Sequence, residues 1–350
     1  MSDTWWDQST FAQRRANLTA RSQAIGAVRQ YFIEQGFMEV ETPAIQLSPG
    51  IDRHIQPFHL SVRGPFDQQV RNRYLHTSPE FAMKKLLAAG ETKIFQICHV
   101  FRDGEEGRLH HPEFTMLEWY RAAATYEDLI DDVVSLASAA AAAVGQDVFR
   151  HGTHKTEINQ SWRRMSVADA FFEFANIDLL KEVPDQDEWS ADGFAQRAMA
   201  AGVRCEPGDQ WDDVFHRVML ERIEPILADG PPIVLVDFPE PVGALARPKA
   251  SDTRVCERAE AYVCGIELAN GFSELIDPVE QRRRFVRDQK AYDKLYGKAP
   301  PIDEGFLSAL EKMPESAGMA LGIDRLIMLM TGADHIKDVM WAPVDMKDDS

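Results

Sequence analysis

The chain has 350 residues, of which 45% are hydrophobic, and its 56 acidic and 38 basic residues give a formal net charge of −18. This composition excludes a disordered polymer, the lack of an apolar run of about 18 residues excludes an ordinary membrane-spanning helix, and the acidic balance gives no electrostatic footprint for nucleic acid. Because the N-terminus MSDTWWDQST has no secretion-signal pattern, we expect a cytoplasmic protein with no membrane partner.

The first predicted elements are a long helix followed directly by a strand. Apolar residues recur at helical spacing from Leu18 to Phe32, and Gly36 suits a left-handed C-cap, which predicts a helix over about residues 14–35. Residues 37–43 alternate apolar with acidic side chains and end at a proline, which predicts a strand.

A helix and a hairpin are predicted next. Ser78 as N-cap and Gly90 at the end delimit a helix between them. Residues 93–102 and 113–121 are both typical of strands and are joined by a charged, Gly-containing loop. We therefore expect them to form an antiparallel hairpin with a long loop.

The remaining predicted elements follow residue 126. We expect 145–165 to be irregular, helices over 127–144, 166–175, 211–227, 278–296 and 324–330, and strands over 233–236, 256–263, 266–275 and 316–321. If residues 264–265 form a turn, Glu260 lies opposite Ala269 and shares a sheet face with Glu267. The pattern predicts an α+β fold, with an antiparallel sheet flanked by helices in a single domain over 1–350.

The predicted hairpin carries the first candidate site residues. Glu118 and Tyr120 are two residues apart and point the same way, and Phe114 and Met116 continue that face, so the four can line one pocket. Arg102 ends the facing strand, where a planar bidentate donor suits a phosphate. Taken singly, Arg102 could equally be half of a surface salt bridge and Glu118 a solvated strand residue.

Two further groups of residues indicate a charged ligand. Glu260, Glu267 and Glu274 would repel one another on one sheet face unless cations neutralise them, and oxygen ligands favour Mg²⁺. From spacing alone, at least one of them could instead simply face water. Gly322 and Arg325 stand where a strand enters a helix N-terminus, a combination that favours phosphate.

Together these segments resemble the signature motifs of the class II aminoacyl-tRNA synthetases, most closely the lysine branch. Residues 36–43 are similar to motif 1, whose helix and strand build the dimer interface in that family, so the resemblance implies a homodimer. Residues 101–120 are similar to motif 2, residues 318–326 to motif 3, and residues 267–275 to a lysine-branch pattern. The resemblance covers nearly the whole chain.

The resemblance implies a role for each matching residue. Arg102 and Arg325 would be catalytic, on the α- and γ-phosphates of ATP, and Glu260 and Glu267 would hold Mg²⁺. The implied ATP site comprises Arg102, Asp103, Gly104, His111, Phe114, Glu267, Leu268, Gly322 and Arg325. The implied amino-acid site comprises Ser78, Glu80, Glu118, Tyr120, Asn270, Glu274 and Ala320, with Arg102 and Asn270 on the carboxylate.

Two departures from the family pattern affect the ATP site. Asp103 and Gly104 stand where the family usually has Asn-Glu, whose Glu contacts the adenine amino group. In this chain we expect Glu105 or a main-chain carbonyl to make that contact instead. His111 stands where Asn is usual.

Two other departures concern the acceptor. Only 35 residues precede Gly36, so we expect no N-terminal anticodon-binding domain, and Ala320 stands where the tRNA-charging enzymes commonly have Gly. Both features resemble the stand-alone paralogs of lysyl-tRNA synthetase that ligate (R)-β-lysine to a lysine of translation elongation factor P. We therefore expect ATP, Mg²⁺, (R)-β-lysine and elongation factor P as reaction partners, and no tRNA.

Two alternatives remain open at this point. One is a truncated lysyl-tRNA synthetase that charges tRNA, and the other is an inactive paralog that senses an amino acid. The retained Arg102, Glu267, Glu274 and Arg325 argue against the inactive form, because a sensor needs neither a phosphate clamp nor metal-binding carboxylates.

Overall fold

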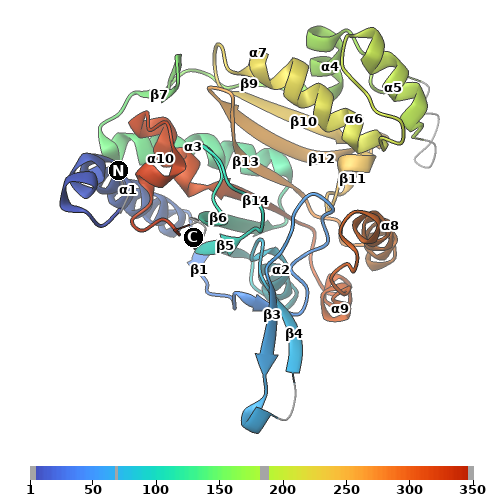
Figure 1. Ribbon diagram of the computed structural model, residues 1–350, viewed down its shortest axis with the longest axis horizontal. Helices are drawn as coiled ribbons and strands as arrows, with labels where there is room; N and C mark the ends of the chain where they lie inside the picture. Colours follow the sequence, from blue (N-terminus) through green and yellow to red (C-terminus); the bar gives the residue numbers. More distant parts are fainter. Residues whose placement is uncertain (1–4, 68–69, 182–188, 346–350) are drawn as a thin grey trace, which may run out of the picture.

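The computed structural model describes residues 5–67, 70–181 and 189–345, and within them a mixed sheet of nine strands forms the centre (Figure 1). The strand order is β1-β5-β6-β14-β13-β12-β10-β9, with β11 paired to β12. Only the pairs β1–β5 and β9–β10 of this described sheet are parallel. The strands are β1 Met38–Glu39, β5 Lys93–Phe101, β6 Glu113–Ala122, β9 Arg163–Ser166, β10 Ile233–Pro239, β11 Pro248–Lys249, β12 Asp252–Val263, β13 Ile266–Ser273 and β14 Ser316–Gly322. A mainly antiparallel sheet among irregularly placed helices confirms the predicted α+β class.

Three helices cover one face of this sheet: α1 (Gln8–Glu34), α3 (Tyr126–Val144) and α10 (Ile323–Thr331). Phe32, Trp119 and Leu326 are fully buried in the core that these helices form with the strands. Helix α3 begins at a capping box of Thr125 and Asp128. Helix α1 begins earlier than predicted because the Asp7 side chain accepts hydrogen bonds from two backbone N–H groups of its first turn.

The other face of the sheet is bordered by α2 (Glu80–Ala88), α8 (Pro278–Tyr296) and α9 (Glu304–Leu310). Side chains alternate along a strand, so Leu117 and Trp119 of β6 enter the first core while Glu118 and Tyr120 point to this second face. The rings of Phe81 and Phe306 stack at 4.0 Å and join α2 to α9.

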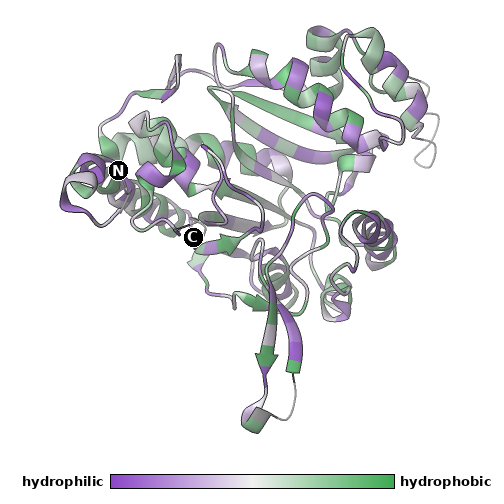
Figure 2. Cartoon of the chain, in the orientation of Figure 1, coloured by the Kyte–Doolittle hydropathy of each residue, from purple (hydrophilic) through white to green (hydrophobic). Residues whose placement is uncertain are grey.

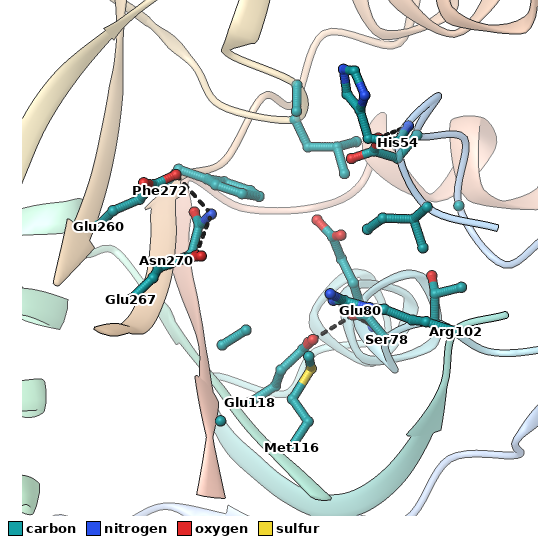
Figure 3. A pocket seen from close by; sticks show the side chains of 18 of the residues that line it. His54, Ser78, Glu80, Arg102, Met116, Glu118, Glu260, Glu267, Asn270 and Phe272 are labelled. Atoms are coloured by element: carbon teal, nitrogen blue, oxygen red, sulfur yellow. Dashed lines mark hydrogen bonds between the residues drawn. The ribbon is translucent and has the colours of Figure 1, made fainter. Parts of the chain in front are cut away.

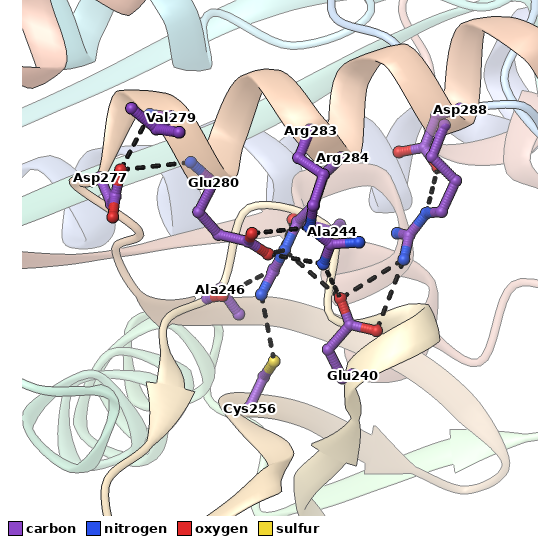
Figure 4. Close-up of polar contacts among 11 residues, drawn as sticks. Glu240, Ala244, Ala246, Cys256, Asp277, Val279, Glu280, Arg283, Arg284 and Asp288 are labelled. Atoms are coloured by element: carbon purple, nitrogen blue, oxygen red, sulfur yellow. Dashed lines mark hydrogen bonds and ion pairs between the residues drawn. The ribbon is translucent and has the colours of Figure 1, made fainter. Parts of the chain in front are cut away.

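A buried polar network fixes α8 to the loop after β10 (Figure 4). The guanidinium of Arg284, which is fully buried, donates to the backbone carbonyls of Ala244 and Ala246 at 2.9 Å and to the Glu280 carboxylate at 2.8 Å. Buried Glu240 pairs with Arg283 at 3.2 Å. Each of these two buried charges has a partner, so the network attaches α8 to this loop beside the second face.

Four helices form a separate group at the β9 edge: α4 (Val167–Ala175), α5 (Ala191–Ala200), α6 (Trp211–Val218) and α7 (Glu224–Leu227). Their apolar faces pack against β9 and β10 around a second aromatic core. In Figure 2 the ribbon of α6 alternates between hydrophilic and hydrophobic residues, as expected for a helix with one buried and one exposed face. No helix of the described ranges is both long and apolar enough to cross a bilayer.

Several strands were not predicted. A small sheet consists of β2 (Ile45–Gln46), β3 (His59–Arg63) and β4 (Val70–Leu75), and Figure 1 shows the β3–β4 hairpin projecting from the body. The prediction that 145–165 is irregular was wrong, because β7 (Val148–His151), β8 (His154–Glu157) and β9 lie there. These strands are only four residues long and owe their pairing to partners that local periodicity does not reveal.

Two predicted boundaries also differ. The strand expected over 37–43 pairs with β5 only at Met38 and Glu39, at the edge of the sheet, before the chain leaves it toward the proline. The β12–β13 register has Tyr262 opposite Glu267, but Glu260 lies opposite Asn270 and not Ala269. An irregularity between Ala261 and Tyr262 shifts the pairing by one residue, a β-bulge that alternation alone does not predict.

Candidate active site

A cavity of about 680 Å³ lies over the second face of the sheet, and cross-strand neighbours form its floor. Glu260, Asn270, Ala320 and Glu118 are successive partners on β12, β13, β14 and β6, so they form one row across four strands. All four line the cavity. Residues distant in sequence therefore meet because the antiparallel registers align them.

A second row runs parallel to the first, two residues further along each strand. It consists of Arg258, Phe272, Gly318 and Tyr120, which also line the cavity. A Cβ atom on Gly318 would come within 2.7 Å of Glu274 Oε1 and still closer to the Tyr120 ring. Glycine at this position therefore leaves the room that these two side chains occupy.

An acidic cluster lies where α2 meets β6. Ser78 and Tyr120 donate hydroxyl hydrogen bonds to the two oxygens of Glu118, the latter at 3.0 Å. Burial, reinforced by the nearby Glu80 carboxylate, raises the pKa of Glu118 to about 8, although the two hydroxyl donors oppose the rise. A cation bound beside Glu118 would therefore stabilise the ionised form of this carboxyl group.

Lys84 lies behind this cluster. Its ammonium nitrogen is 2.5 Å from Glu80 Oε1 and 2.5 Å from Glu274 Oε2. Burial raises the pKa of Glu274, against the opposing effect of Lys84. The Glu274 side chain is fully buried against Lys84 and does not line the cavity.

Two carboxylates meet on the opposite side of the cavity, where Figure 3 shows Glu260, Glu267 and Asn270 facing Ser78, Glu80 and Arg102. The Asn270 amide nitrogen lies 3.1 Å from Glu260 Oε1 and 3.5 Å from Glu267 Oε1. Burial raises the pKa of Glu260, partly offset by Arg258, and the charge of Glu267 adds to the rise. Two converging carboxylates with this mutual repulsion fit a hard divalent cation such as Mg²⁺.

Arg325 borders this carboxylate pair at the start of α10. Its guanidinium donates to the backbone carbonyl of Glu267 at 2.8 Å and lies 2.9 Å from His110 Nε2. The Glu267 carboxylate is 3.7 Å away. The guanidinium is thus oriented mainly by neutral partners and retains capacity for an anion.

Arg102 is another cation of the cavity. Its guanidinium carbon lies 5.1 Å from the centroid of the Phe114 ring, and its nearest carboxylate in an ion pair, Glu105, is 3.6 Å away. Its Nε is buried and has no hydrogen-bond partner among the described residues. A guanidinium stacked on a ring with donors to spare is suited to a phosphate or carboxylate ligand.

The structure brings most of the predicted site residues together. Those that line the cavity are Ser78, Glu80, Arg102, His111, Phe114, Glu118, Tyr120, Glu260, Glu267, Leu268, Asn270, Ala320, Gly322 and Arg325. Asp103, Gly104 and Glu274 do not line it. The Asp103 N–H donates to the Gln56 carbonyl at 2.7 Å, and its carboxylate accepts from the Gly104 N–H. This turn lies outside the cavity lining, whereas Glu105 is part of it.

Sequence reasoning missed part of the cavity wall. A loop over residues 48–55 closes one side, where Arg53 and His54 contact Asp212 of α6. No local pattern connects this loop with α6. Arg258, by contrast, could have been predicted from the sequence, because it lies two residues before Glu260 and therefore on the same strand face. In the structure the two side chains form an ion pair at 2.6 Å.

Comparison with known proteins identifies the class to which this fold and site belong. The family model of the class II tRNA synthetases (D, K and N) matches residues 4–345. The chain therefore belongs to this family. Within it, the chain is 38% identical over 346 residues to a protein of Vibrio atlanticus named "Elongation factor P--(R)-beta-lysine ligase", covering 98% of this chain and 99% of that protein.

Proteins with the same name in two other organisms are similarly related. The Haemophilus ducreyi protein is 38% identical over 324 residues, with 92% of each chain covered. The Proteus mirabilis protein is 38% identical over 334 residues, with 94% of this chain and 95% of that protein covered. The chain groups with these ligases within the class II family.

Proposed function

We propose that this protein activates (R)-β-lysine with ATP and transfers it to a lysine side chain of translation elongation factor P. The proposal rests on sequence identities of 36–38%, over 92–98% of the chain, to eight proteins named "Elongation factor P--(R)-beta-lysine ligase". In the first step the amino-acid carboxylate attacks the α-phosphorus of ATP, forming an acyl-adenylate and releasing pyrophosphate. In the second step the acceptor amine attacks the acyl carbon and AMP leaves.

One side of the cavity suits ATP. We assign Arg102 to the α-phosphate, where it stabilises the charge that develops during attack, and Arg325 to the γ-phosphate. Glu260 and Glu267 would hold Mg²⁺, whose charge offsets that of the phosphates. The remaining wall of this subsite comprises His111, Phe114, Leu268 and Gly322.

The other side suits an amino acid with two ammonium groups. We assign Ser78 and Glu80 to one ammonium group and Glu118 and Tyr120 to the distal one, with Glu274 adding its charge from outside the cavity lining. Asn270 and Arg102 are assigned to the carboxylate. Ala320 lies between Asn270 and Glu118 in the floor row, so its methyl group limits the space at the centre of this subsite.

A homodimer is part of the proposal. Four apolar side chains in or within four residues of the motif 1 match at 36–43 are about half exposed: Ile33, Met38, Ile45 and Leu47. Such a group of exposed apolar residues favours burial against a second copy. The family resemblance assigns the dimer interface to the helix and strand of motif 1, which carry Ile33 and Met38.

Amino-acid-dependent exchange between ATP and pyrophosphate tests the first step. We expect exchange with (R)-β-lysine, and with α-lysine at lower efficiency, because one methyl group supports only about 1 to 3 kcal/mol of discrimination. Leucine serves as the control amino acid, since it lacks a distal ammonium group. Exchange with no diamino acid at all would contradict the proposal and favour the inactive paralog.

The pKa of Glu118 predicts a pH dependence. A carboxyl group with its pKa raised to about 8 is largely protonated below that pH, and it must lose the proton to bind an ammonium group. We expect kcat/KM for the amino acid to rise about tenfold between pH 6.5 and 8, while the KM for ATP stays constant. Glu118→Gln should flatten this profile, and an unchanged profile in that variant would remove Glu118 from the step.

A further inference from the structure

Lys84 is a buried cation to which the proposed roles give no task. Its side chain is 1% exposed, and its ammonium bridges Glu80 on the same helix and Glu274 beyond the end of β13. The rings of Phe272 and Phe306 lie 5.1 and 5.9 Å from the ammonium nitrogen and form the apolar part of its surroundings. Burying an ammonium group is costly, so this position requires the two carboxylates.

The charged groups around Lys84 come from three elements. Glu80 is on α2, Glu118 and Tyr120 are on β6, and Glu274 follows β13. Burial alone would lower the pKa of Lys84, but Glu274 and Glu80 outweigh it and hold this pKa above its ordinary value. Lys84 therefore remains an ammonium ion throughout the neutral pH range. Three carboxylates with one fixed ammonium leave two negative charges when all are ionised.

We infer that Lys84 is a positioning residue of the amino-acid site, whose ammonium orients Glu80 and Glu274 and supplies the positive charge that lets this buried carboxylate cluster present net negative charge to a diamino acid. The inference rests on the proposed function and assigns Lys84 a task within it. The i,i+4 pair ties Glu80 to its own helix, and the contact to Glu274 ties that helix to the sheet. Lys84 thus fixes both the charge and the spacing of the ammonium-binding groups.

Removing this cation has a defined electrostatic consequence. Burial already raises the pKa of Glu118 and of Glu274, and the charge of Lys84 opposes both rises, so removing that charge favours the protonated forms further. A protonated carboxyl group no longer attracts an ammonium ion. Raising the pH restores the ionised form, so a loss caused by missing charge shrinks at high pH, whereas a loss caused by damaged packing does not.

The test compares Lys84→Met with wild type in ATP–pyrophosphate exchange driven by (R)-β-lysine at pH 7 and pH 9. We expect the KM for (R)-β-lysine to rise about tenfold or more at pH 7, the KM for ATP to change less than about twofold, and the amino-acid defect to shrink several-fold at pH 9. Lys84→Gln, which keeps hydrogen-bond donors without the charge, should show the same pH-dependent defect and replaces the Met variant if that one does not fold.

Lys85→Met is the matched control on the same helix. Lys85 is partly exposed and pairs with Asp303 at 2.5 Å, away from the cavity, so its loss should leave both KM values unchanged. A pH-independent defect, or equal losses for ATP and amino acid, would reduce Lys84 to a structural ion pair and overturn the inference. Exchange absent from wild type would instead contradict the proposed function.

Discussion

Arg102→Ala should lower the rate of ATP–pyrophosphate exchange by about 10²-fold or more, the usual scale for the loss of one preorganised charge stabiliser. Arg102 directly follows β5, lines the cavity, lies over the Phe114 ring, and among the described residues has an ion pair only with Glu105, at 3.6 Å. Its charge is therefore available where the α-phosphate would react. The loss should appear in kcat, because the developing negative charge is larger in the transition state than in bound ATP.

Two variants serve as controls for this measurement. Arg102→Lys keeps the positive charge but loses the planar bidentate donor, so we expect intermediate activity. Arg108→Ala removes an exposed guanidinium from the same connecting loop, and because Arg108 does not line the cavity, exchange should stay near the wild-type rate. Wild-type exchange in Arg102→Ala would exclude Arg102 from the chemistry.

Asp324→Ala should lower the free energy of unfolding by about 3 to 5 kcal/mol, the range for breaking a buried ion pair on one side only. Asp324 opens α10, where one oxygen lies 2.5 Å from Arg21 of α1 and the other accepts the Thr115 N–H of β6 at 2.7 Å. Arg21 also donates to Thr115 Oγ1 at 2.7 Å. The substitution leaves the Arg21 charge buried with no carboxylate partner from α10.

Urea unfolding measures this effect as a lower midpoint. Glu173→Ala is the matched control, because its ion pair with Arg163, at 3.3 Å, is exposed on both sides and should contribute less than about 1 kcal/mol. The double variant Arg21→Met/Asp324→Leu removes both charges and should recover part of the loss. An unchanged midpoint in Asp324→Ala would show that Arg21 finds adequate partners in its backbone and hydroxyl acceptors.

Much of the site could be predicted from the sequence because it is built on strands. Alternation alone puts Glu118 and Tyr120 on one face, and the resemblance to the synthetase motifs assigns Glu267 and Arg325 to one ligand. Helix ends were also predictable where a cap is local, as at Thr125 with Asp128 in α3. These signals depend on residues only a few positions apart.

The remainder depends on contacts between distant segments. The β-bulge that moves Glu260 opposite Asn270 has no local signature. The i,i+4 spacing of Glu80 and Lys84 is visible in the sequence, but nothing there predicts that Glu274 completes the group. Glu274 was expected to face the cavity, and the structure directs it to Lys84 instead.

The acceptor is the central claim, and parallel transfer assays test it most directly. Radiolabelled (R)-β-lysine and ATP would be incubated with the enzyme and either elongation factor P or total tRNA, with an elongation factor P variant lacking the acceptor lysine as control. We expect ATP-dependent label on elongation factor P, none on the lysine-deficient variant, and none on tRNA. Label on tRNA with elongation factor P unlabelled would contradict the proposal and identify the protein as a tRNA-charging enzyme.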